Sequence, residues 1–252
     1  MSELEIKKIR PGLSSAALHI IAMALMLCDH LWATIFPYLD VLTCIGRIAF
    51  PIFAFMIAEG YRHTSNVKKY MLRMLIFAVL AEIPFNLVYG GQVSYIYHQN
   101  VLWTFLIALV CMTLIDKVKA KGRTWLTIFA GFGIVFLGAL IGTIGMVDYY
   151  GAGVLTVLTF YFFREKKWWC FAGQLICMYY INVEMLGGYY YPVTIAGHYF
   201  ELQQQGLALI ALIPIWLYNG TRGYNAKWFK YFCYAFYPVH FAVLYVIWQY
   251  IM

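Results

Sequence analysis

The sequence predicts an all-α fold, a polytopic transmembrane helical bundle of about nine helices, with ten as the alternative, and with a cytoplasmic N-terminus. Three observations support this fold class. Hydrophobic residues make up 63% of the 252 residues and charged residues 12%, whereas a soluble domain has roughly 45–50% and about 25%. The apolar residues form nearly continuous segments, unlike the alternating segments of about ten residues in a membrane β-barrel. The basic residues are concentrated in the gaps between these segments.

Nine apolar segments follow one another along the chain. A helix crosses a hydrocarbon core of ~30 Å with about 20 residues, and in lipid it satisfies its backbone N–H and C=O groups within its own segment. Several segments are shorter than this, so we expect them to use flanking aromatic residues or to pack inside the bundle. The segments are residues 13–37, 41–60, 70–89, 101–116, 125–142, 148–163, 168–183, 203–218 and 231–251.

Local features support individual segments. The first is too long for the hydrophobic core of a signal peptide, so we expect it to be retained. Pro51 in the second and Pro238 in the last each deprive the carbonyl four residues earlier of its donor, which predicts kinks. Gly138 and Gly142 near the end of the fifth have the GxxxG spacing of a closely packed transmembrane helix. No linker or internal repeat divides the chain, so residues 1–252 are expected to form one transmembrane domain.

The basic residues predict the orientation of the bundle. Seventeen of the eighteen Lys and Arg residues fall in five clusters at alternate gaps, and the exception, Arg47, lies inside the second segment. Because short cytoplasmic loops retain Lys and Arg, we expect the N-terminus and every second loop in the cytoplasm and the C-terminus outside. The net charge of +7 then faces anionic lipid, and no nucleic-acid partner is expected. The clusters are Lys7, Lys8 and Arg10, followed by residues 62–73, 117–123, 164–167 and 222–230.

The longest predicted outer loop, about residues 184–202, is rich in tyrosine and has no Lys or Arg. Its aromatic residues suit either an interfacial belt or a re-entrant lid, and the belt is favoured. The six cysteines lie in or beside apolar segments without metal-ligand spacing. Neither a disulfide framework nor a metal site is therefore expected.

Six ionisable residues lie within the apolar segments. Such groups cost roughly 2.5–3.5 kcal/mol at mid-helix and need a partner or a water-filled cavity. At a rise of ~1.5 Å per residue, His30 and Arg47 lie at a similar depth, roughly 10 Å below the outer ends of neighbouring helices. This convergence predicts a functional cavity, with a salt-bridge network that only fixes packing as the alternative. The six residues are Asp29, His30, Arg47, Glu82, Asp148 and His240.

Asp29 is expected to pair with Arg47 across the helix interface. Asp29 and its neighbour His30 point about 100° apart on their helix, so they need not contact each other. An ion pair between Asp29 and Arg47 leaves His30 neutral and free to act as a base.

A second polar group, formed by Glu59, Arg62 and His63, ends the second segment on its cytoplasmic side. Together with nearby cations it suits a phosphorylated cytosolic ligand. A solvated loop that only follows the positive-inside rule is the alternative. The nearby cations are Lys68, Lys69, Arg73 and Arg222.

Four stretches carry a family resemblance, and the second is the most specific: IIAMALMLCDHLWATIFP, IGRIAFPIFAFMIAEGYRHTSNVKKYMLRMLIFAVLAEIPFNL, LYNGTRG and YAFYPVHF. Together they resemble the TraX family of bacterial membrane proteins. The resemblance covers nearly the whole chain, although residues 101–200 are similar mainly in hydropathy. The family is named for the N-terminal acetylation of conjugative pilin, and it is similar to polytopic membrane acyltransferases that use acyl-CoA and a histidine in an early helix.

The resemblance implies a catalytic role for His30 and supporting roles for four other residues. His19 stands where a lysine is expected in this family, so no donor-binding role is carried over to it. The four supporting residues are Asp29, Arg47, Glu59 and His240.

The residues and the resemblance together predict an acyltransferase embedded in the bacterial cytoplasmic (inner) membrane. It would move an acyl group, first of all acetyl, from cytosolic acetyl-CoA or another acyl-CoA to an amine or hydroxyl at the outer side. The acceptor would be a peptide, a lipid or a small molecule, and no metal is expected. The predicted catalytic residues are His30, Asp29, Arg47, Glu82 and His240. The predicted donor-binding residues are Glu59, Arg62, His63, Lys68, Lys69 and Arg222.

Two other functions are kept as alternatives. A transporter or channel would use the same buried charges as a path for protons or solutes. A non-catalytic assembly subunit would use the aromatic outer loop as a docking surface.

Overall fold

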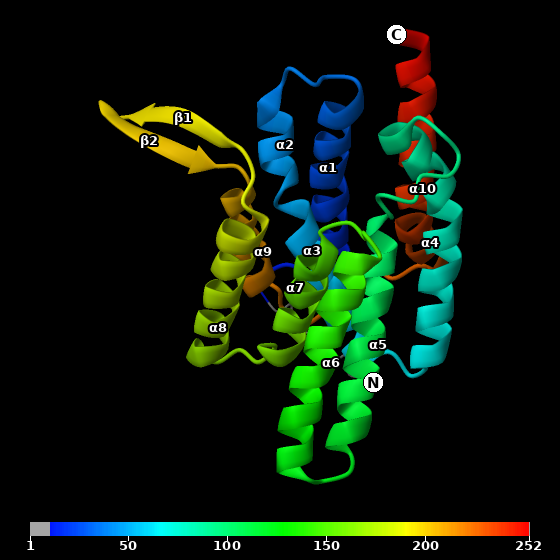
Figure 1. The fold of residues 1–252 in the computed structure, drawn as a ribbon, viewed down its shortest axis with the longest axis vertical. Coiled ribbons are helices and arrows are strands. Elements are labelled where there is room, and N and C mark those ends of the chain that lie inside the picture. The colour runs from blue at the N-terminus through cyan, green and yellow to red at the C-terminus, as the bar shows by residue number, and fades with distance from the viewer. Residues whose placement is uncertain (1–10, 252) are drawn as a thin grey trace, which may run out of the picture.

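The computed structural model describes residues 11–251, most of which lie in helices (Figure 1). The first predicted basic cluster, Lys7, Lys8 and Arg10, lies outside the described residues. The α-helices are α1 (Ser15–Thr34), α2 (Asp40–Gly46), α3 (Ala49–His63), α4 (Val67–Gly90), α5 (Val101–Lys119), α6 (Thr124–Ile144), α7 (Tyr150–Phe162), α8 (Trp168–Tyr179), α9 (Leu212–Trp216) and α10 (Lys227–Ile251). A π-helix (Tyr180–Leu186), strands β1 (Tyr190–Ile195) and β2 (His198–Gln203) and a 3-10 helix (Gln205–Ala211) complete the fold.

Six helical stretches in residues 11–251 are long and apolar enough to cross a membrane, namely α1, α2 with α3, α4, α5, α6 and α10. Helix α7 and the 3-10 helix with α9 are apolar but shorter. Each of the nine predicted segments coincides with a helix or with two consecutive helices. The predicted all-α bundle is therefore confirmed, whereas the side of the membrane on which the N-terminus lies stays a prediction.

The second predicted segment is interrupted between α2 and α3. The last residue of α2 is Gly46, and α3 begins at Ala49, so Arg47 lies in the break. Pro51 follows four residues after Arg47 and has no N–H to donate to the Arg47 carbonyl. Pro51 therefore accounts for the interruption of the helix at Arg47.

The loops divide between two ends of the bundle. The loops after α1 and α4, the β-hairpin and the C-terminal end of α10 lie at the upper end in Figure 1, which we call the hairpin end. The loops after α3, α5 and α7 lie at the opposite end, and the described basic clusters at residues 62–73, 117–123 and 164–167 lie at or beside these three loops. We call this the basic end.

Helix α6 shows which surface faces the surroundings of the bundle. Only Gly138 and Gly142 of this helix are buried, while large apolar side chains such as Phe132 are 74% exposed. A Cβ at Gly138 would lie 2.5 Å from the sulfur of Cys111 on α5, so the glycine allows α6 to approach α5 closely. The predicted close packing at the GxxxG sequence is confirmed, and the apolar outer face suits lipid and not water.

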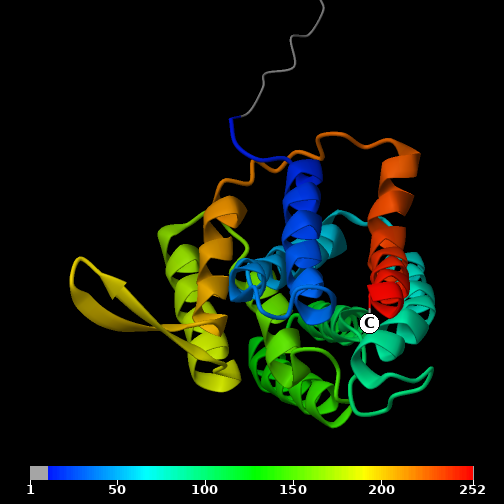
Figure 2. The same ribbon diagram turned by 90° about the horizontal axis from the view of Figure 1, so that it is seen from above.

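Helix α1 occupies a central position among the helices that carry the predicted site. It packs against α2, α3 and α10, and α4 packs against α10 and α5. Seen from above, α1 lies between α9 and α10 (Figure 2). The side chains of α1, α3, α4, α5 and α10 thus meet inside the bundle, although these helices are far apart in the sequence.

The predicted outer loop at residues 184–202 forms a hairpin. Strands β1 and β2 pair antiparallel, with Tyr190 opposite Gln203 and Thr194 opposite Tyr199. The turn at Ala196 and Gly197 has positive φ at both residues, as in the tight type I′ turn that matches strand twist. The hairpin extends away from the bundle at the hairpin end (Figures 1 and 2), so it does not form a lid that dips back between the helices.

Candidate functional site

Charged residues surround a cavity of about 220 Å³ in the half of the bundle toward the hairpin end. We call it the His30 cavity. It is lined by Asp29 and His30 of α1, by Arg47 between α2 and α3, and by Asp148 before α7. Its other polar or aromatic lining includes Trp32, Tyr89, His98, Tyr149 and Tyr237. Four of the six ionisable residues predicted to converge therefore share one cavity.

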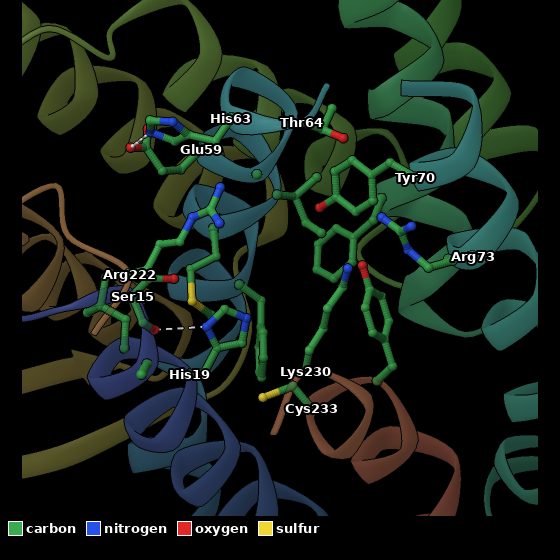
Figure 3. Close-up of a pocket in the computed structure, with 18 of the residues that line it drawn as sticks. Ser15, His19, Glu59, His63, Thr64, Tyr70, Arg73, Arg222, Lys230 and Cys233 are labelled. Carbon is green, nitrogen blue, oxygen red and sulfur yellow. Dashed lines mark hydrogen bonds and ion pairs between the residues drawn. The ribbon is translucent and has the colours of Figure 1, made fainter. Parts of the chain in front are cut away.

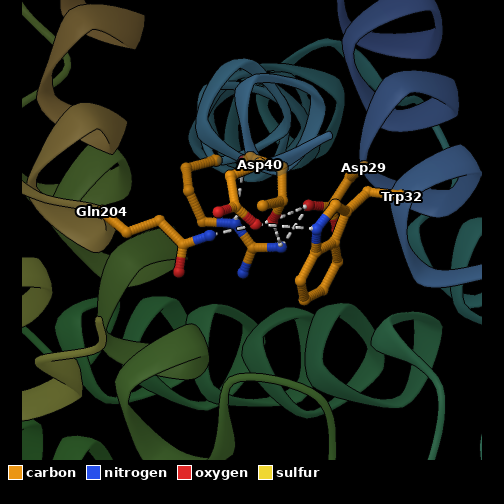
Figure 4. A network of polar contacts seen from close by, with 6 residues as sticks. Asp29, Trp32, Asp40 and Gln204 are labelled. Carbon is orange, nitrogen blue, oxygen red and sulfur yellow. Dashed lines mark hydrogen bonds and ion pairs between the residues drawn. The ribbon is translucent and has the colours of Figure 1, made fainter. Parts of the chain in front are cut away.

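Asp29 and Arg47 form an ion pair on one side of this cavity, as predicted. Thr43 Oγ1 donates to the same carboxylate over 2.8 Å, and Gln204 Nε2 donates to Thr43 Oγ1 over 3.1 Å. Figure 4 shows this network between α1, the α2–α3 segment and the residue that precedes the 3-10 helix. The hydrogen bonds from Thr43 and Gln204 hold this partly buried ion pair in one arrangement.

Gly46 makes the Asp29–Arg47 pair possible. A Cβ at position 46 would lie 2.3 Å from the Cβ of Asp29, closer than two carbon atoms can approach. Only glycine lets the end of α2 reach α1 at this point, and the next residue is Arg47. The backbone approach thus places the guanidinium beside the carboxylate.

Replacing Gly46 with alanine is expected to separate α2 from α1. Overpacking of this kind typically costs about 1–3 kcal/mol, so the midpoint of thermal unfolding in detergent should fall. Gly131→Ala on α6 is the matched control, because a Cβ there meets no atom within 4 Å. Equal unfolding midpoints for the two variants would contradict the proposed role of Gly46.

His30 and His240 form a buried pair next to the Asp29–Arg47 network. The Nδ1 of His30 lies 2.5 Å from the Nε2 of His240, and the Nδ1 of His240 lies 2.7 Å from the carbonyl oxygen of Phe236. A carbonyl only accepts, so the Nδ1 of His240 carries its proton. For two neutral rings, His240 Nε2 must then accept, and His30 must donate from Nδ1. The hydrogen bonds therefore assign the lone pair of His30 to Nε2, which has no hydrogen-bond partner among residues 11–251.

His240 does not line the cavity, although it contacts the histidine that does. Its side chain is buried on α10, and Phe241 lies beside both rings, 4.2 Å from His30 and 4.6 Å from His240 between centroids. Pro238 lies two residues before His240 in the same helix. The sequence predicted that His240, near the middle of the last segment, would converge with His30, but it did not show that His240 lies behind His30.

Glu82 differs from the prediction. It lines neither this cavity nor the larger one described below. Its Oε2 accepts hydrogen bonds from Asn100 and, over 2.8 Å, from Trp103 Nε1. Its other oxygen is buried with no partner in the described part of the chain. Residue counting predicted that Glu82 lies in the outer half of its segment. The carboxylate nevertheless points toward the start of α5 and away from the His30 cavity.

His98, which was not predicted, contributes to the cavity from the loop between α4 and α5. Its Nε2 lies 3.4 Å from Asp148 Oδ1. Burial opposes the charged imidazole, but the hydrogen bond to Asp148 and the charges of Asp148 and Glu82 outweigh burial and raise the pKa of His98. Its position one turn before the fourth apolar segment could have indicated this role. A histidine so close to the end of a segment can point its side chain into the bundle.

The His98–Asp148 pair is expected to make stability depend on pH. Because the folded pKa is raised above the unfolded value of about 6.5, the protonated pair stabilises the fold fully below that value, and this contribution is lost as pH rises through the folded pKa. His98→Ala should therefore lower the unfolding midpoint more at pH 5.5 than at pH 9. Asp148→Asn added to His98→Ala should introduce no further dependence on pH. A constant effect of His98→Ala across this range would contradict the pairing.

A second and larger cavity, of about 640 Å³, lies at the basic end. We call it the basic-end cavity. Four cations line it, Lys69, Arg73, Arg222 and Lys230, together with His19 and His63. Figure 3 shows Arg73 and Lys230 pointing into it from α4 and α10, opposite Arg222 and His19. Of the predicted donor-binding residues Glu59, His63, Lys69 and Arg222 line it, whereas Arg62 and Lys68 do not.

The positive charge of the basic-end cavity is not neutralised within residues 11–251. None of its four Lys and Arg side chains forms an ion pair there. The one carboxylate in the lining, Glu59, is held by His63 over 2.9 Å. The Nε of Arg73 is buried without a hydrogen-bond partner in this part of the chain, which leaves donor capacity for an anion.

The two cavities meet at a shared apolar wall, which consists of Met26, Phe53, Val101, Phe105 and Tyr237. These five residues line both cavities. The ring of Tyr237 lies 6.4 Å from the ring of His30 between centroids. These five side chains therefore lie between the basic end and His30.

Other polar features add no third site. In residues 11–251 no group of three or more His, Cys, Asp or Glu side chains is arranged to hold a metal ion. All six cysteines are free. Asp116, near the basic end, accepts hydrogen bonds from Tyr61 over 2.8 Å and Tyr161 over 2.5 Å, which joins α5 to α3 and α7.

Comparisons with known proteins agree with the resemblance seen in the sequence. The model of the TraX protein family matches residues 14–248. The chain is 25% identical over 244 residues to a "Probable fimbrial assembly protein FimC, serogroup H1" of Dichelobacter nodosus, and the alignment covers 92% of this chain and 94% of that relative. No solved structure matches the chain.

Proposed function

The chain belongs to the TraX family, and from this premise we propose that it is an acyl-CoA-dependent acyltransferase of the bacterial cytoplasmic membrane. It transfers an acyl group, acetyl first of all, from donor bound at the basic end to an amine or hydroxyl presented at the hairpin end. One observation supports this proposal above the others. A cavity lined by four cations that form no ion pair among residues 11–251 shares five lining side chains with a cavity that holds a histidine.

The basic-end cavity has the properties expected of a donor site. Its volume of about 640 Å³ lies within the range of roughly 300–1,000 Å³ that suits a cofactor-sized ligand. The phosphates of CoA are polyanionic, and Arg side chains bind phosphate oxygens through two parallel hydrogen bonds. Arg73, Arg222, Lys69 and Lys230 supply this charge without first breaking an ion pair.

His30 is the proposed general base. Its Nε2 takes the proton from the acceptor nitrogen or oxygen as that atom forms a bond to the acyl carbon and the carbon–sulfur bond of the thioester breaks. The proton then passes to the departing CoA thiolate. His240 Nε2 already accepts from His30 Nδ1, and this hydrogen bond strengthens when His30 becomes an imidazolium. His240 therefore supports the protonated state of His30 without contacting the substrate.

Arg47 has one guanidinium nitrogen left for the reaction. Its Nη2 contacts Asp29 and Thr43, and its Nε lies 3.4 Å from the Thr43 carbonyl oxygen. The Nη1 has no hydrogen-bond partner among the described residues. We infer that Nη1 stabilises the oxyanion that develops on the acyl carbonyl, while Asp29 fixes the orientation of the guanidinium.

Release of free thiol from acetyl-CoA tests the proposed activity. The purified protein in detergent is incubated with acetyl-CoA and two probe acceptors, a short peptide with a free α-amine and an N-blocked peptide containing serine. CoA release that depends on an acceptor, together with acetylated peptide in the mass spectrum, is the expected result. Absence of both products with protein that binds no CoA would refute the proposal.

A second candidate function is supported by the name of the relative. A fimbrial assembly protein can act by binding other components without catalysis, and the hairpin carries exposed aromatic residues such as Tyr190 and Phe200 that suit such binding. Under this candidate, loss of His30 leaves assembly intact. Under the acyltransferase proposal the acceptor belongs to the fimbrial or pilus system, and loss of His30 stops its modification.

A further inference from the structure

The shared apolar wall lies between the proposed donor site and His30. The acceptor atom must lie within hydrogen-bonding distance of His30, and the acyl carbon must come within about 3–3.5 Å of that atom. The donor enters from the basic-end cavity, so its thioester has to pass between the wall side chains. The acyl chain leads, because the phosphates at the other end of CoA are held by cations at the basic end.

The space beyond the wall is small. The His30 cavity has a volume of about 220 Å³, which lies below the roughly 300–1,000 Å³ of a typical ligand pocket. The reacting end of the acceptor has to occupy part of this volume. Stacked rings also line it, since Tyr149 lies 4.0 Å from Phe50 and Phe50 lies 5.9 Å from Phe105 between centroids. A long acyl chain therefore has no room beyond the wall.

We propose that the wall, with Phe53 and Met26 as its adjustable members, restricts the donor to short acyl groups. This inference rests on the proposed acyltransferase function. Phe53 is half-buried and has no ring contact among the aromatic pairs of residues 11–251, unlike Phe105, which stacks on Phe50. Met26 is a flexible side chain on α1, one turn before His30. Truncating either side chain enlarges the passage without removing the stacked rings.

Two variants and a matched control test the wall. Phe53→Ala and Met26→Ala change residues that line both cavities, whereas Met23→Ala changes a buried methionine of the same helix that lines only the basic-end cavity. The first measurement is the ratio of kcat/KM for acetyl-CoA to that for hexanoyl-CoA. Because one excess methylene in an apolar pocket costs about 10–200-fold, the unmodified protein should prefer acetyl-CoA by more than about tenfold. Phe53→Ala and Met26→Ala should lower this ratio by about tenfold, and Met23→Ala should leave the ratio unchanged.

A binding measurement separates the wall from the reaction. The thioethers S-ethyl-CoA and S-hexyl-CoA cannot transfer their alkyl groups, so their dissociation constants report fit alone. The unmodified protein should bind S-ethyl-CoA more tightly than S-hexyl-CoA. In Phe53→Ala the two dissociation constants should become nearly equal. Phe53→Leu, which keeps an apolar side chain, repeats the measurement if the alanine variant unfolds.

The outcomes distinguish the inference from the proposed function. Equal affinity of the unmodified protein for both thioethers, or equal ratios in Phe53→Ala and Met23→Ala, would overturn the wall as the determinant of chain length and leave the donor site in place. Failure to bind either thioether would refute the donor site itself and the inference with it.

Discussion

Replacing His30 with alanine is expected to lower kcat for acyl transfer by about 10²- to 10⁴-fold, the usual contribution of a positioned general base. The Nε2 of His30 is the lone pair that the hydrogen-bond chain from Phe236 through His240 leaves unused. Without it, the only other imidazole among the described residues that lines the His30 cavity is His98, which is paired with Asp148. The rate is measured as acceptor-dependent release of CoA from acetyl-CoA.

The matched control for this prediction is His198→Ala. His198 lies at the start of β2 on the hairpin, is exposed and lines neither cavity. Its replacement should leave kcat within about twofold of the unmodified protein, because it removes no group from the proposed chemistry. Turnover by His30→Ala at the rate of His198→Ala would remove His30 from the catalytic role and favour the assembly subunit.

The same experiment separates a base from a positioning residue. His240→Ala should reduce kcat less than His30→Ala does, and it should change the pH profile of kcat, because His30 Nδ1 then loses the acceptor that stabilises the imidazolium. A purely structural role of His240 would lower the amount of folded protein and leave the pH profile of the remaining activity unchanged.

Removing Arg73 is expected to have the second large effect, on donor binding. A hydrogen bond to a charged group contributes about 1.5–3 kcal/mol, which corresponds to an increase of about 10- to 100-fold in the dissociation constant of acetyl-CoA. The guanidinium of Arg73 lines the basic-end cavity, and its Nε has no hydrogen-bond partner among the described residues. Isothermal titration calorimetry with acetyl-CoA measures the dissociation constant. In the acyl-transfer assay KM should rise while kcat changes little.

Arg62→Ala and Lys68→Ala are the controls for donor binding. Both residues belong to the same basic cluster as Arg73, but neither lines the cavity. Their loss should change the dissociation constant by less than about threefold, since exposed charges contribute roughly 0–1 kcal/mol. An equal effect of Arg62→Ala and Arg73→Ala would show that general positive charge, and not the cavity, attracts the donor.

The sequence predicted the helices well because lipid imposes a strict condition on the backbone. Every one of the nine apolar segments became a helix or two consecutive helices, and the break at Arg47 follows from Pro51. The pairing of Asp29 with Arg47 was also predictable, because two opposite charges at one depth on neighbouring helices have few other partners.

The direction in which a side chain leaves its helix was harder to predict. Residue counting gives depth, at about 1.5 Å per residue, but the rotation of each helix depends on its packing neighbours. Glu82 therefore turned toward Asn100 and Trp103, and His240 came to lie behind His30. The contributions of His98 and Lys230 come from contacts between segments far apart in the chain.

The Asp29–Arg47 pair and the cations of the basic-end cavity carry different information about the protein. The partly buried, paired charges of Asp29 and Arg47 join α1 to the α2–α3 segment. The use of acyl-CoA depends on what occupies the basic-end cavity, and its unpaired cations specify only that the ligand is strongly anionic.

The apolar wall also has an electrical consequence for the cell. Two cavities that enter a bilayer from opposite ends would short-circuit the membrane if they joined, and each 100 mV of potential is worth about 2.3 kcal/mol for every elementary charge that leaks through. Of the five wall side chains only Tyr237 carries a polar atom, a single hydroxyl, and stripping an ion of most of its water costs far more than the potential supplies. The wall that is proposed to select the acyl chain would thus also act as an insulator between the two cavities.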